Sequence, residues 1–294
     1  MESEDLIPRM SDLNDALNAD VLDERYLRTL PSIRRYFYRF LPTIIAQIIE
    51  AFLVHKKYDV VFSWYEQVGL PFAILQRFAR SKVPHVLQSS WMTKGRKRWI
   101  MKHAHKALNH IVFSSSVQSD IAVKELGIPS SRVTTVKYPV DVRFWQPMNG
   151  PSDLICAVGM ESRDYPTLIE ALRGLDIPCH IATGLSRGQL FETVKSLYRI
   201  DDLPRNIIVG KKNYVDLRKL YSRSRFVVIP LLPTDTDNGV TTILEAMSMG
   251  KVVICSRVRG QVDVIENRKT GIYVPQGDPD ALRQAILELW YNPA

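Results

Sequence analysis

The second half of the chain alternates short, almost uninterrupted apolar runs with stretches in which apolar residues recur at helical spacing. Runs of the first kind predict strands buried on both faces, and the others predict helices that cover a parallel sheet. The predicted strands are Leu154–Val158, His180–Thr183, Asn206–Val209, Phe226–Pro230, Val252–Ser256 and Gly271–Val274. The predicted helices are Thr167–Leu175, Gln189–Tyr198, Val215–Ser222, Thr241–Met249 and Pro279–Trp290, the last with Asp278 as its cap.

The first half repeats this pattern, and a segment rich in Pro, Gly, Asn and Ser between Trp145 and Ser152 separates the two halves. The pattern predicts an α/β chain of two doubly wound, Rossmann-like domains, residues 1–148 and 149–294, which face each other across a cleft. Ligands of such sheets bind at the carboxyl ends of the strands. The strands predicted in the first half are Asp59–Trp64, His85–Gln88, His110–Ser114 and Val133–Lys137, preceded by a strand-like run at Ala19–Leu22.

Composition narrows the class of protein without choosing a partner. The 294 residues are 46% hydrophobic and 24% charged, which is typical of a globular protein, and the net charge of +8 favours anionic partners. Nucleotide diphosphates, anionic lipid headgroups and nucleic acids are all negatively charged, so the net charge does not choose among them. Cys156, Cys179 and Cys255 fall in predicted strands and lack metal-ligand spacing, which indicates reduced thiols in a cytoplasmic protein. The N-terminus is acidic and does not read as a signal peptide, and the apolar run Phe40–Val54 is too short to cross a bilayer.

The segment Asp237–Met247 carries the most specific chemistry. It follows the predicted strand Phe226–Pro230 and leads into a helix, so the turn presents backbone N–H groups and the positive end of a helix to an anion. Glu245 follows Thr241 by four residues and shares its helix face, where a carboxylate can accept hydrogen bonds from both hydroxyls of a ribose. Spacing alone leaves open the alternative of a capped helix with an exposed Glu.

This segment resembles the E-x7-E motif of retaining family 4 glycosyltransferases, with Asp237 in place of the first Glu. The resemblance implies a GT-B fold, a nucleotide-diphosphate sugar as donor, a glycan, glycolipid or small-molecule acceptor, retention at the anomeric carbon, and neither a cofactor nor an essential metal. It also implies that Glu245 holds the ribose and that Asp237 contacts the transferred sugar. The donor-binding residues implied around this turn are Asp237, Asn238, Gly239, Val240, Thr241 and Glu245. The matching sequence continues through Ala246-Met247, Gly250–Ile254, Arg259-Gly260 and Thr270–Pro279.

A second matching segment, Val158–Ala171, follows the first strand of the second half. Relatives carry Gly-Arg here and then a Lys, both of which bind the diphosphate; this chain has Gly159, then Met160, and Arg163 at the Lys position. The resemblance therefore assigns Arg163, with Asp237 and Glu245, to the catalytic set, because a fixed cation stabilises a leaving diphosphate. Lys211 or Lys212 is a candidate for the second charge. The alternative is that Arg163 pairs with Asp164 or Glu161 at the surface.

The acceptor side offers fewer signals. Gln88 and Ser89 end a predicted strand, where relatives often carry polar groups near the acceptor. Glu66 follows another strand and is a further candidate, although a solvated loop charge is the default interpretation. His85 falls inside a strand and is expected to be a core residue rather than a base. Retaining enzymes of this type are thought to use the leaving phosphate as the base.

Two basic stretches remain, Lys94–Lys106, which predicts a cationic amphipathic helix, and Arg34–Leu41, in which Arg alternates with aromatic residues. Both suit an anionic membrane surface, which would make the protein peripheral at the inner face of the membrane. Single-stranded nucleic acid would also suit interleaved aromatics, but the chain carries no recognition motif for it. A solvated helix face is the third interpretation. His103 and His105 do not share a helix face, so a metal site is not expected there.

The chain departs from the family pattern at its ends. Met1 leads into polar sequence where relatives have an apolar strand and a Gly-containing loop, and relatives usually continue beyond Ala294. An incomplete chain or a shortened variant is therefore expected. The missing first strand, Met160 and Asp237 argue for the alternative of a sugar-nucleotide-binding pseudoenzyme or incomplete GT-B module without transfer activity, whereas an active retaining glycosyltransferase is the main expectation.

Overall fold

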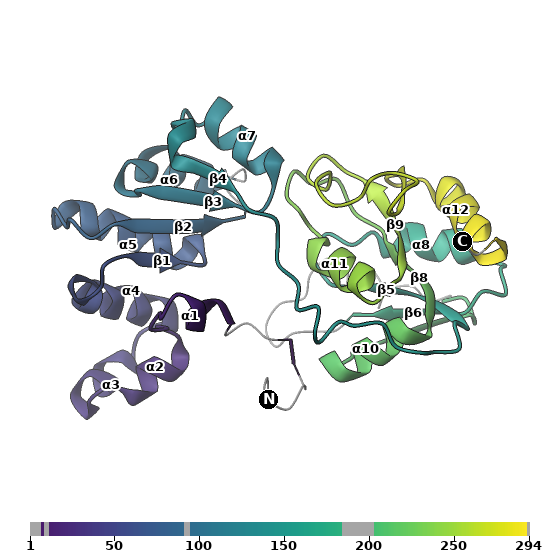
Figure 1. Ribbon diagram of the computed structural model, residues 1–294, viewed down its shortest axis with the longest axis horizontal. Helices are drawn as coiled ribbons and strands as arrows, with labels where there is room; N and C mark the ends of the chain where they lie inside the picture. Colours follow the sequence, from purple (N-terminus) through teal and green to yellow (C-terminus); the bar gives the residue numbers. More distant parts are fainter. Residues whose placement is uncertain (1–6, 9–11, 91–94, 184–202, 293–294) are drawn as a thin grey trace. The chain divides into compact units, whose positions relative to one another are not determined.

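The computed structural model describes residues 7–8, 12–90, 95–183 and 203–292, which form two compact units (Figure 1). The N-terminal unit comprises Ser11–Lys137, and the C-terminal unit includes Tyr138–Ala294. The chain thus passes from one unit to the next between Lys137 and Tyr138, whereas the sequence placed the boundary between Met148 and Asn149. The residues between these points, among them the fully buried Phe144 and Trp145, pack into the core of the C-terminal unit.

The C-terminal unit is built on a six-stranded parallel sheet, as the continuous apolar runs predicted. Strand β5, in the middle of the sheet, is buried along its whole length, which explains why its bounds were predicted without error. The strand order is β10-β9-β8-β5-β6-β7. The strands are β5 (Leu154–Val158), β6 (Cys179–Ala182), β7 (Ile207–Gly210), β8 (Ser224–Ile229), β9 (Val252–Arg257) and β10 (Ile272–Pro275).

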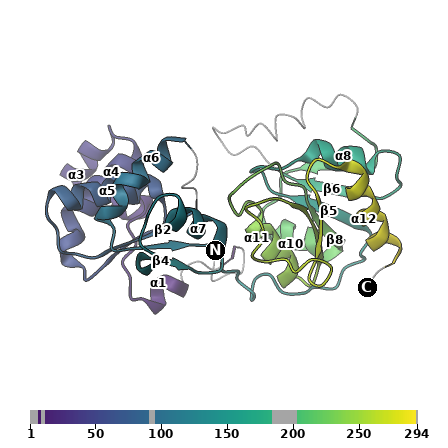
Figure 2. The same cartoon turned by 90° about the horizontal axis from the view of Figure 1, so that it is seen from above.

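Helices cover both faces of this sheet, which makes it doubly wound (Figures 1 and 2). Helices α8 (Tyr165–Leu172) and α12 (Pro279–Tyr291) share one hydrophobic cluster with alternate strand residues such as Ile155 and Ala157. Helices α10 (Tyr214–Arg223) and α11 (Val240–Ser248) share the other cluster with Cys156 and Val158. The four helices predicted in the described part of this unit are thus present with shifted ends, and the predicted helix Gln189–Tyr198 lies outside the described residues.

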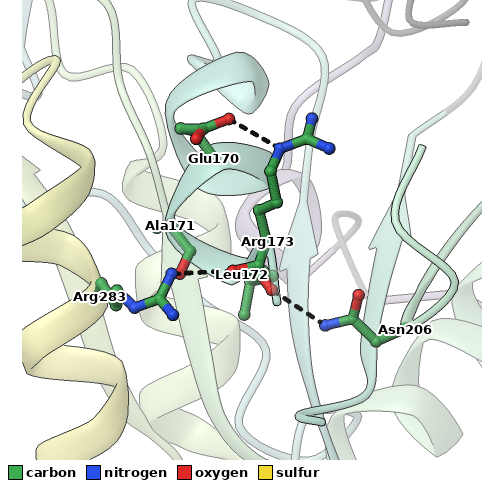
Figure 3. Close-up of polar contacts among 6 residues, drawn as sticks. All are labelled: Glu170, Ala171, Leu172, Arg173, Asn206 and Arg283. Atoms are coloured by element: carbon green, nitrogen blue, oxygen red, sulfur yellow. Dashed lines mark hydrogen bonds and ion pairs between the residues drawn. The ribbon is translucent and has the colours of Figure 1, made fainter. Parts of the chain in front are cut away.

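Side chains complete the hydrogen bonding at the end of α8, as Figure 3 shows. The last carbonyls of a helix have no partner within the helix. Arg283 from α12 donates to the carbonyl of Arg173 over 2.9 Å, and Asn206 donates to the carbonyls of Leu172 and Ile177. At the start of α12, Asp278 accepts from the backbone N–H of Ala281 over 2.9 Å, so the predicted cap is confirmed.

The three cysteines are free and buried, Cys156 in β5, Cys179 in β6 and Cys255 in β9. Burial raises the pKa of the Cys156 and Cys255 thiols to about 12, because the charged thiolate is poorly solvated there. The prediction of structural thiols is therefore confirmed.

The N-terminal unit carries a four-stranded parallel sheet in the order β1-β2-β3-β4. Leu87, Ile111 and Phe113 of this sheet form one hydrophobic cluster with residues of α5 and α6, which lie on the same side of the sheet (Figure 2). The strands are β1 (Val61–Ser63), β2 (His85–Ser89), β3 (His110–Phe113) and β4 (Val133–Thr135). The helices between and after them are α5 (Glu66–Phe78), α6 (Gly95–Ala104) and α7 (Ser116–Lys124), with single 3₁₀ turns at His55–Lys57, His105–Ala107 and Ser130–Arg132.

Four helices precede β1: α1 (Asp12–Ala16), α2 (Glu24–Thr29), α3 (Ser32–Tyr38) and α4 (Thr43–Val54). The predicted strand-like run Ala19–Leu22 is wrong, because this segment has no regular structure and its first three residues are exposed, so no apolar face is available to hold a strand. Helix α3 buries none of its residues. A polar clamp holds it instead, in which Arg34 and Tyr38 bind the two oxygens of the fully buried Glu50 over 2.9 and 2.8 Å. In the described ranges, no helix has the length and apolarity needed to span a bilayer.

Candidate functional site

The turn before α11 is held in shape by a buried polar cluster. Gly239 precedes the helix with a φ of +88°, a conformation that side-chain-bearing residues rarely adopt. The Asn238 side-chain oxygen accepts hydrogen bonds from Thr234 and Thr236. Gln261, which is buried, donates to the backbone carbonyls of Asp237 and Asn238. The turn is thereby fixed just ahead of α11, where the first N–H groups of a helix have no partner within the helix itself.

Glu245 lies one turn further along α11, and a neighbouring helix orients it. The hydroxyl of Tyr221, fully buried in α10, donates to Oε2 of Glu245 over 2.9 Å. Burial raises the pKa of the Glu245 carboxyl to about 7, although the Tyr221 hydrogen bond and the positive charge of Arg163 both act to lower it. Glu245 is thus a half-buried, oriented carboxylate, and the alternative of an exposed surface Glu is wrong.

Arg163 is buried, with 3% of its surface exposed. Its guanidinium donates to the carbonyl of Val158 over 2.9 Å, to the carbonyl of Glu161 over 2.8 Å and to the hydroxyl of Thr242 in α11 over 3.2 Å. The alternative of a surface ion pair is therefore wrong. Gly159 permits this placement, because a Cβ atom there would lie 2.3 Å from a guanidinium nitrogen of Arg163. The result is a buried positive charge fixed beside the start of α11.

A cavity of about 980 Å³ lies in front of these groups within the C-terminal unit. It opens at the carboxyl ends of β5, β6 and β7, where parallel sheets bind ligands. Exposed lysines line one part of it, and Glu245 with the first turn of α11 lines another. An elongated ligand with an anionic group and vicinal hydroxyls fits this arrangement. The predicted donor residues in its wall are Gly159, Lys211, Lys212, Thr241 and Glu245.

The remaining predicted donor residues lie behind or beside this wall. Asn238 and Val240 are buried, and Asp237 is half-buried, its backbone carbonyl accepting from Val240 and Gln261. Sequence reasoning missed Tyr221, Thr242 and Gln261. The spacing within α10 makes Tyr221 a core residue of that helix, and no local signal shows that its hydroxyl meets a carboxylate on α11.

On the acceptor side, Glu66 is the first residue of α5, and only 7% of it is exposed. Its Oε1 accepts hydrogen bonds from the hydroxyl of Ser89 over 2.7 Å and from the backbone N–H of Ser90 over 2.8 Å. The default of a solvated loop charge is therefore wrong, since Glu66 joins α5 to the end of β2. Gln88 and Ser89 are the last residues of β2, half-buried and buried respectively.

His85 is a core residue, as predicted. It is fully buried, its Nε2 lies 2.9 Å from the hydroxyl of Ser63, and burial lowers its pKa to about 4. The basic stretch of the N-terminal unit forms α6, so the predicted helix is confirmed where the structure describes it; Lys94 lies outside the described residues. In the described ranges, no three His, Cys, Asp or Glu side chains come together in a way that would hold a metal ion.

Two curated proteins are related to this chain in sequence. It is 22% identical over 268 residues to an Escherichia coli UDP-Gal:alpha-D-GlcNAc-diphosphoundecaprenol alpha-1,3-galactosyltransferase, covering 81% of this chain and 67% of that protein. It is also 22% identical over 125 residues to an uncharacterized glycosyltransferase of Methanocaldococcus jannaschii, covering 42% of this chain. The chain spans about a third of the length of that archaeal relative (34%).

A solved structure and a family model also match this chain. The structure of the Anabaena protein HepE in complex with UDP and glucose matches 84% of this chain and 72% of its own with a TM-score of 0.68, at 16% sequence identity. The model of the family described as "Glycosyl transferases group 1" matches residues 163–292, which hold α11, Glu245 and the turn before them. Residues 163–292 are thus similar to the glycosyl transferases group 1 family, and the chain has the GT-B fold.

Proposed function

We propose that this protein transfers a sugar from a nucleotide-diphosphate sugar to an acceptor, with retention at the anomeric carbon. The observation that carries the proposal is the cavity of the C-terminal unit, where an oriented carboxylate, the start of α11 and two lysines surround one space. The E. coli relative is named for a UDP-sugar donor, and HepE binds UDP, so UDP is the first nucleotide to test.

The groups that line the cavity and those that lie beside it each have a part in this reaction. Glu245 accepts hydrogen bonds from the ribose hydroxyls, and Asp237 contacts the transferred sugar. The N–H groups at the start of α11, with Lys211 and Lys212, hold the diphosphate, and the buried charge of Arg163 adds to their field. As the bond between the sugar and the diphosphate breaks, the acceptor oxygen attacks the same face, and its proton passes to the leaving phosphate.

The acceptor belongs to the N-terminal unit, at the carboxyl ends of its parallel strands. There Glu66, Gln88 and Ser89 are the candidates, and the hydrogen bonds of Glu66 make it a positioning residue for Ser89 and Ser90 at the end of β2. A glycan or a glycolipid is the proposed acceptor, and the E. coli relative is named for a sugar carried on diphosphoundecaprenol.

Two measurements on the purified chain test the proposal. UDP should raise the thermal unfolding midpoint, because a ligand at a hundred times its Kd stabilises the folded state by about 2.7 kcal/mol. UDP-sugars should then be hydrolysed or transferred, and NMR of the released sugar should show the anomeric configuration of the donor. Stabilisation without turnover of any UDP-sugar would favour the pseudoenzyme, and inversion would contradict the proposed mechanism.

The second prediction concerns metal. Lysines, helix N–H groups and a buried guanidinium neutralise the diphosphate in the proposed arrangement, so turnover should survive a millimolar excess of EDTA with little change. The measurement is the initial rate of donor turnover before and after dialysis against the chelator. Complete loss of activity that only magnesium or manganese restores would contradict this assignment.

We also propose that the start of the N-terminal unit contacts an anionic membrane surface, at the inner face of the membrane in the cell. Ile33, Phe37 and Phe40 are each more than half exposed, and the guanidinium of Arg39 lies 4.1 Å from the ring centre of Tyr36. Such a basic and aromatic surface suits the interface of a bilayer, where each cation contributes about 1 kcal/mol.

Sedimentation with vesicles tests this surface. The protein should sediment with vesicles that contain anionic lipid and not with neutral vesicles, and Arg39→Glu should reduce binding several-fold. Lys82→Glu is the matched control, since Lys82 is an exposed residue of the same unit outside this surface. Equal effects of the two substitutions would show that net charge alone matters.

A further inference from the structure

Positive side chains from three elements of the N-terminal unit gather at the amino edge of its sheet. Arg77 lies near the end of α5, which leads into β2. Lys106 lies in the 3₁₀ turn before β3, and Arg132 ends the 3₁₀ turn before β4. Because β2, β3 and β4 are neighbouring parallel strands, the segments that lead into them lie side by side at one edge of the sheet. This edge is opposite to the one at which parallel sheets bind their usual ligands.

The buried His105 shows that these three charges surround one place. Burial lowers the pKa of His105, and the positive charges of Lys106, Arg132 and Arg77 each lower it further. Only 8% of His105 is exposed, and its Nδ1 atom is buried with no hydrogen-bond partner among the described residues. Buried polar atoms are normally hydrogen-bonded, so an unpartnered one beside a group of cations indicates a place where a ligand binds.

Acidic side chains do not neutralise this group in the described ranges. Arg77, Lys106 and Arg132 form no ion pair with a described residue, whereas Lys124 of the same unit pairs with Asp120 over 2.6 Å. The helices α5, α6 and α7 end at this edge, and each helix end carries about −0.5 of an elementary charge. The three cations outweigh the three helix ends and leave a net charge of roughly +1.5, which is close in magnitude to the charge of one phosphate group at neutral pH.

We propose that Arg77, Lys106 and Arg132 form a binding site for a phosphate group at the amino edge of the N-terminal unit. A guanidinium binds phosphate oxygens through paired hydrogen bonds, and a lysine ammonium adds a point charge. The donor cavity lies in the other unit, and the candidate acceptor residues lie at the carboxyl edge of the sheet, so this site is separate from both. The proposal does not depend on the transfer reaction and adds a second anion-binding function to the chain.

Two kinds of molecule carry a suitable group, a soluble phosphate ester and an anionic lipid. Arg77 and Lys106 also line a cavity of about 770 Å³ between α5 and α6, together with Phe78 and Trp99. Phe78 is 83% exposed and Trp99 is 68% exposed, so a lipid that binds through its headgroup would find apolar surface beside it. The two sources therefore differ in whether a hydrocarbon chain adds to the affinity.

Calorimetry on the full chain at low ionic strength tests the site. The probes are inorganic phosphate, glycerol 3-phosphate and dihexanoyl phosphatidic acid, a soluble lipid that carries the same headgroup on two short chains. We expect all three probes to bind. Lys106→Ala and Arg132→Ala should each weaken their binding about tenfold, since each removes a charge-assisted hydrogen bond. Arg132→Lys should retain more of the affinity than Arg132→Ala, because it keeps the charge.

Lys137→Ala is the matched control for Lys106→Ala. Lys137 is an exposed residue of the same unit that follows the end of β4, so its loss removes the same charge from the opposite edge of the sheet. Any phosphate that binds in the donor cavity is equally affected in both variants, so the comparison isolates the amino edge. Because Lys106 and Arg132 are exposed and their charges repel each other, their Ala variants should unfold at or slightly above the original temperature.

The three probes also separate the two sources of the phosphate. Equal affinities for glycerol 3-phosphate and the short-chain lipid would assign the site to a soluble phosphate ester. A tenfold preference for the lipid that Phe78→Ser removes would assign the site to a lipid headgroup, and both results support the phosphate site. If none of the probes binds, or if Lys106→Ala binds them as Lys137→Ala does, the proposed site is wrong.

Discussion

Replacing Glu245 with Gln should weaken UDP binding by about ten- to a hundred-fold and, above pH 7, make the unliganded protein harder to unfold. The loss of affinity follows from the role of the carboxylate, because a hydrogen bond to a charged group contributes about 1.5–3 kcal/mol. The gain in stability follows from the burial of the Glu245 carboxyl, because burial raises the pKa of Glu245 to about 7. The same residue thus opposes folding and supports binding.

The pH dependence has a defined sign. Between the usual pKa of 4.5 and the folded value of about 7, the folded protein keeps a proton on Glu245 that the unfolded chain has lost. The contribution of this group to the free energy of unfolding is therefore fully present below about pH 4.5, is lost as pH rises from there through about 7, and changes no further above that. The Gln variant cannot lose this contribution, so the difference between the two proteins should grow from pH 6 to pH 8.

Chemical unfolding at pH 6 and pH 8, with calorimetry of UDP at pH 8, measures both effects. Glu288→Gln is the control, since Glu288 is a surface residue of α12 in an exposed ion pair with Arg268. Tyr221→Phe removes a hydrogen bond that lowers the pKa of Glu245, so Glu245 should take up a proton at a higher pH. As pH is lowered, the affinity for UDP should therefore begin to fall at a higher pH than in the original protein. Unchanged UDP affinity in Glu245→Gln would remove Glu245 from the donor site.

The sheet of the C-terminal unit could be predicted because its strands are buried on both faces. β5 has no exposed residue, so its apolar run is continuous and its ends are sharp. β7 is less regular, since Ile208 is 63% exposed, and there the prediction began one residue early. At Ala19–Leu22 a few apolar letters predicted a strand where no core exists to receive it. The prediction was accurate where burial alone determined the pattern.

From the sequence, only site residues within one secondary-structure element could be predicted to lie together. The motif placed Thr241 and Glu245 on one helix face, and both lie in the cavity wall. Contacts between different elements could not be predicted from the sequence. For example, nothing in the sequence indicates that the hydroxyl of Tyr221 in α10 donates a hydrogen bond to Glu245 in α11. Glu66 was mistaken for a loop charge for the same reason, since its partners Ser89 and Ser90 belong to another strand end.

Arg163→Ala should reduce the rate constant for donor turnover more than it raises the Michaelis constant. The resemblance to family 4 glycosyltransferases predicts a second phosphate cation where this chain has Met160, so we expect the charge of Arg163 to have a larger share in stabilising the leaving diphosphate. That charge is fixed within the unit by three hydrogen bonds to neutral groups and lies beside the start of α11. Negative charge grows on the diphosphate as the glycosidic bond breaks, so the interaction is stronger in the transition state than in the bound ground state.

The same substitution should also lower stability, and the two effects must be separated. Without the guanidinium, the carbonyls of Val158 and Glu161 lose their donor, at a cost of about 1–3 kcal/mol each where they are shielded from water. Arg163→Gln and Arg163→Lys should both destabilise the protein, because neither reproduces all three bonds. Only Arg163→Lys keeps the charge, so it alone should recover part of the rate.

The affinities for UDP and uridine show whether Arg163 acts on the diphosphate through its positive charge or only supports the structure of the site. If the positive charge acts on the diphosphate, Arg163→Gln should weaken UDP binding and leave uridine binding nearly unchanged, and Arg163→Lys should restore the preference for UDP. A purely structural role would weaken both ligands alike in both variants. If donor turnover keeps its original rate in all of these variants, the cation on the leaving group must be Lys211 or Lys212, which lie in the cavity wall with exposed side chains.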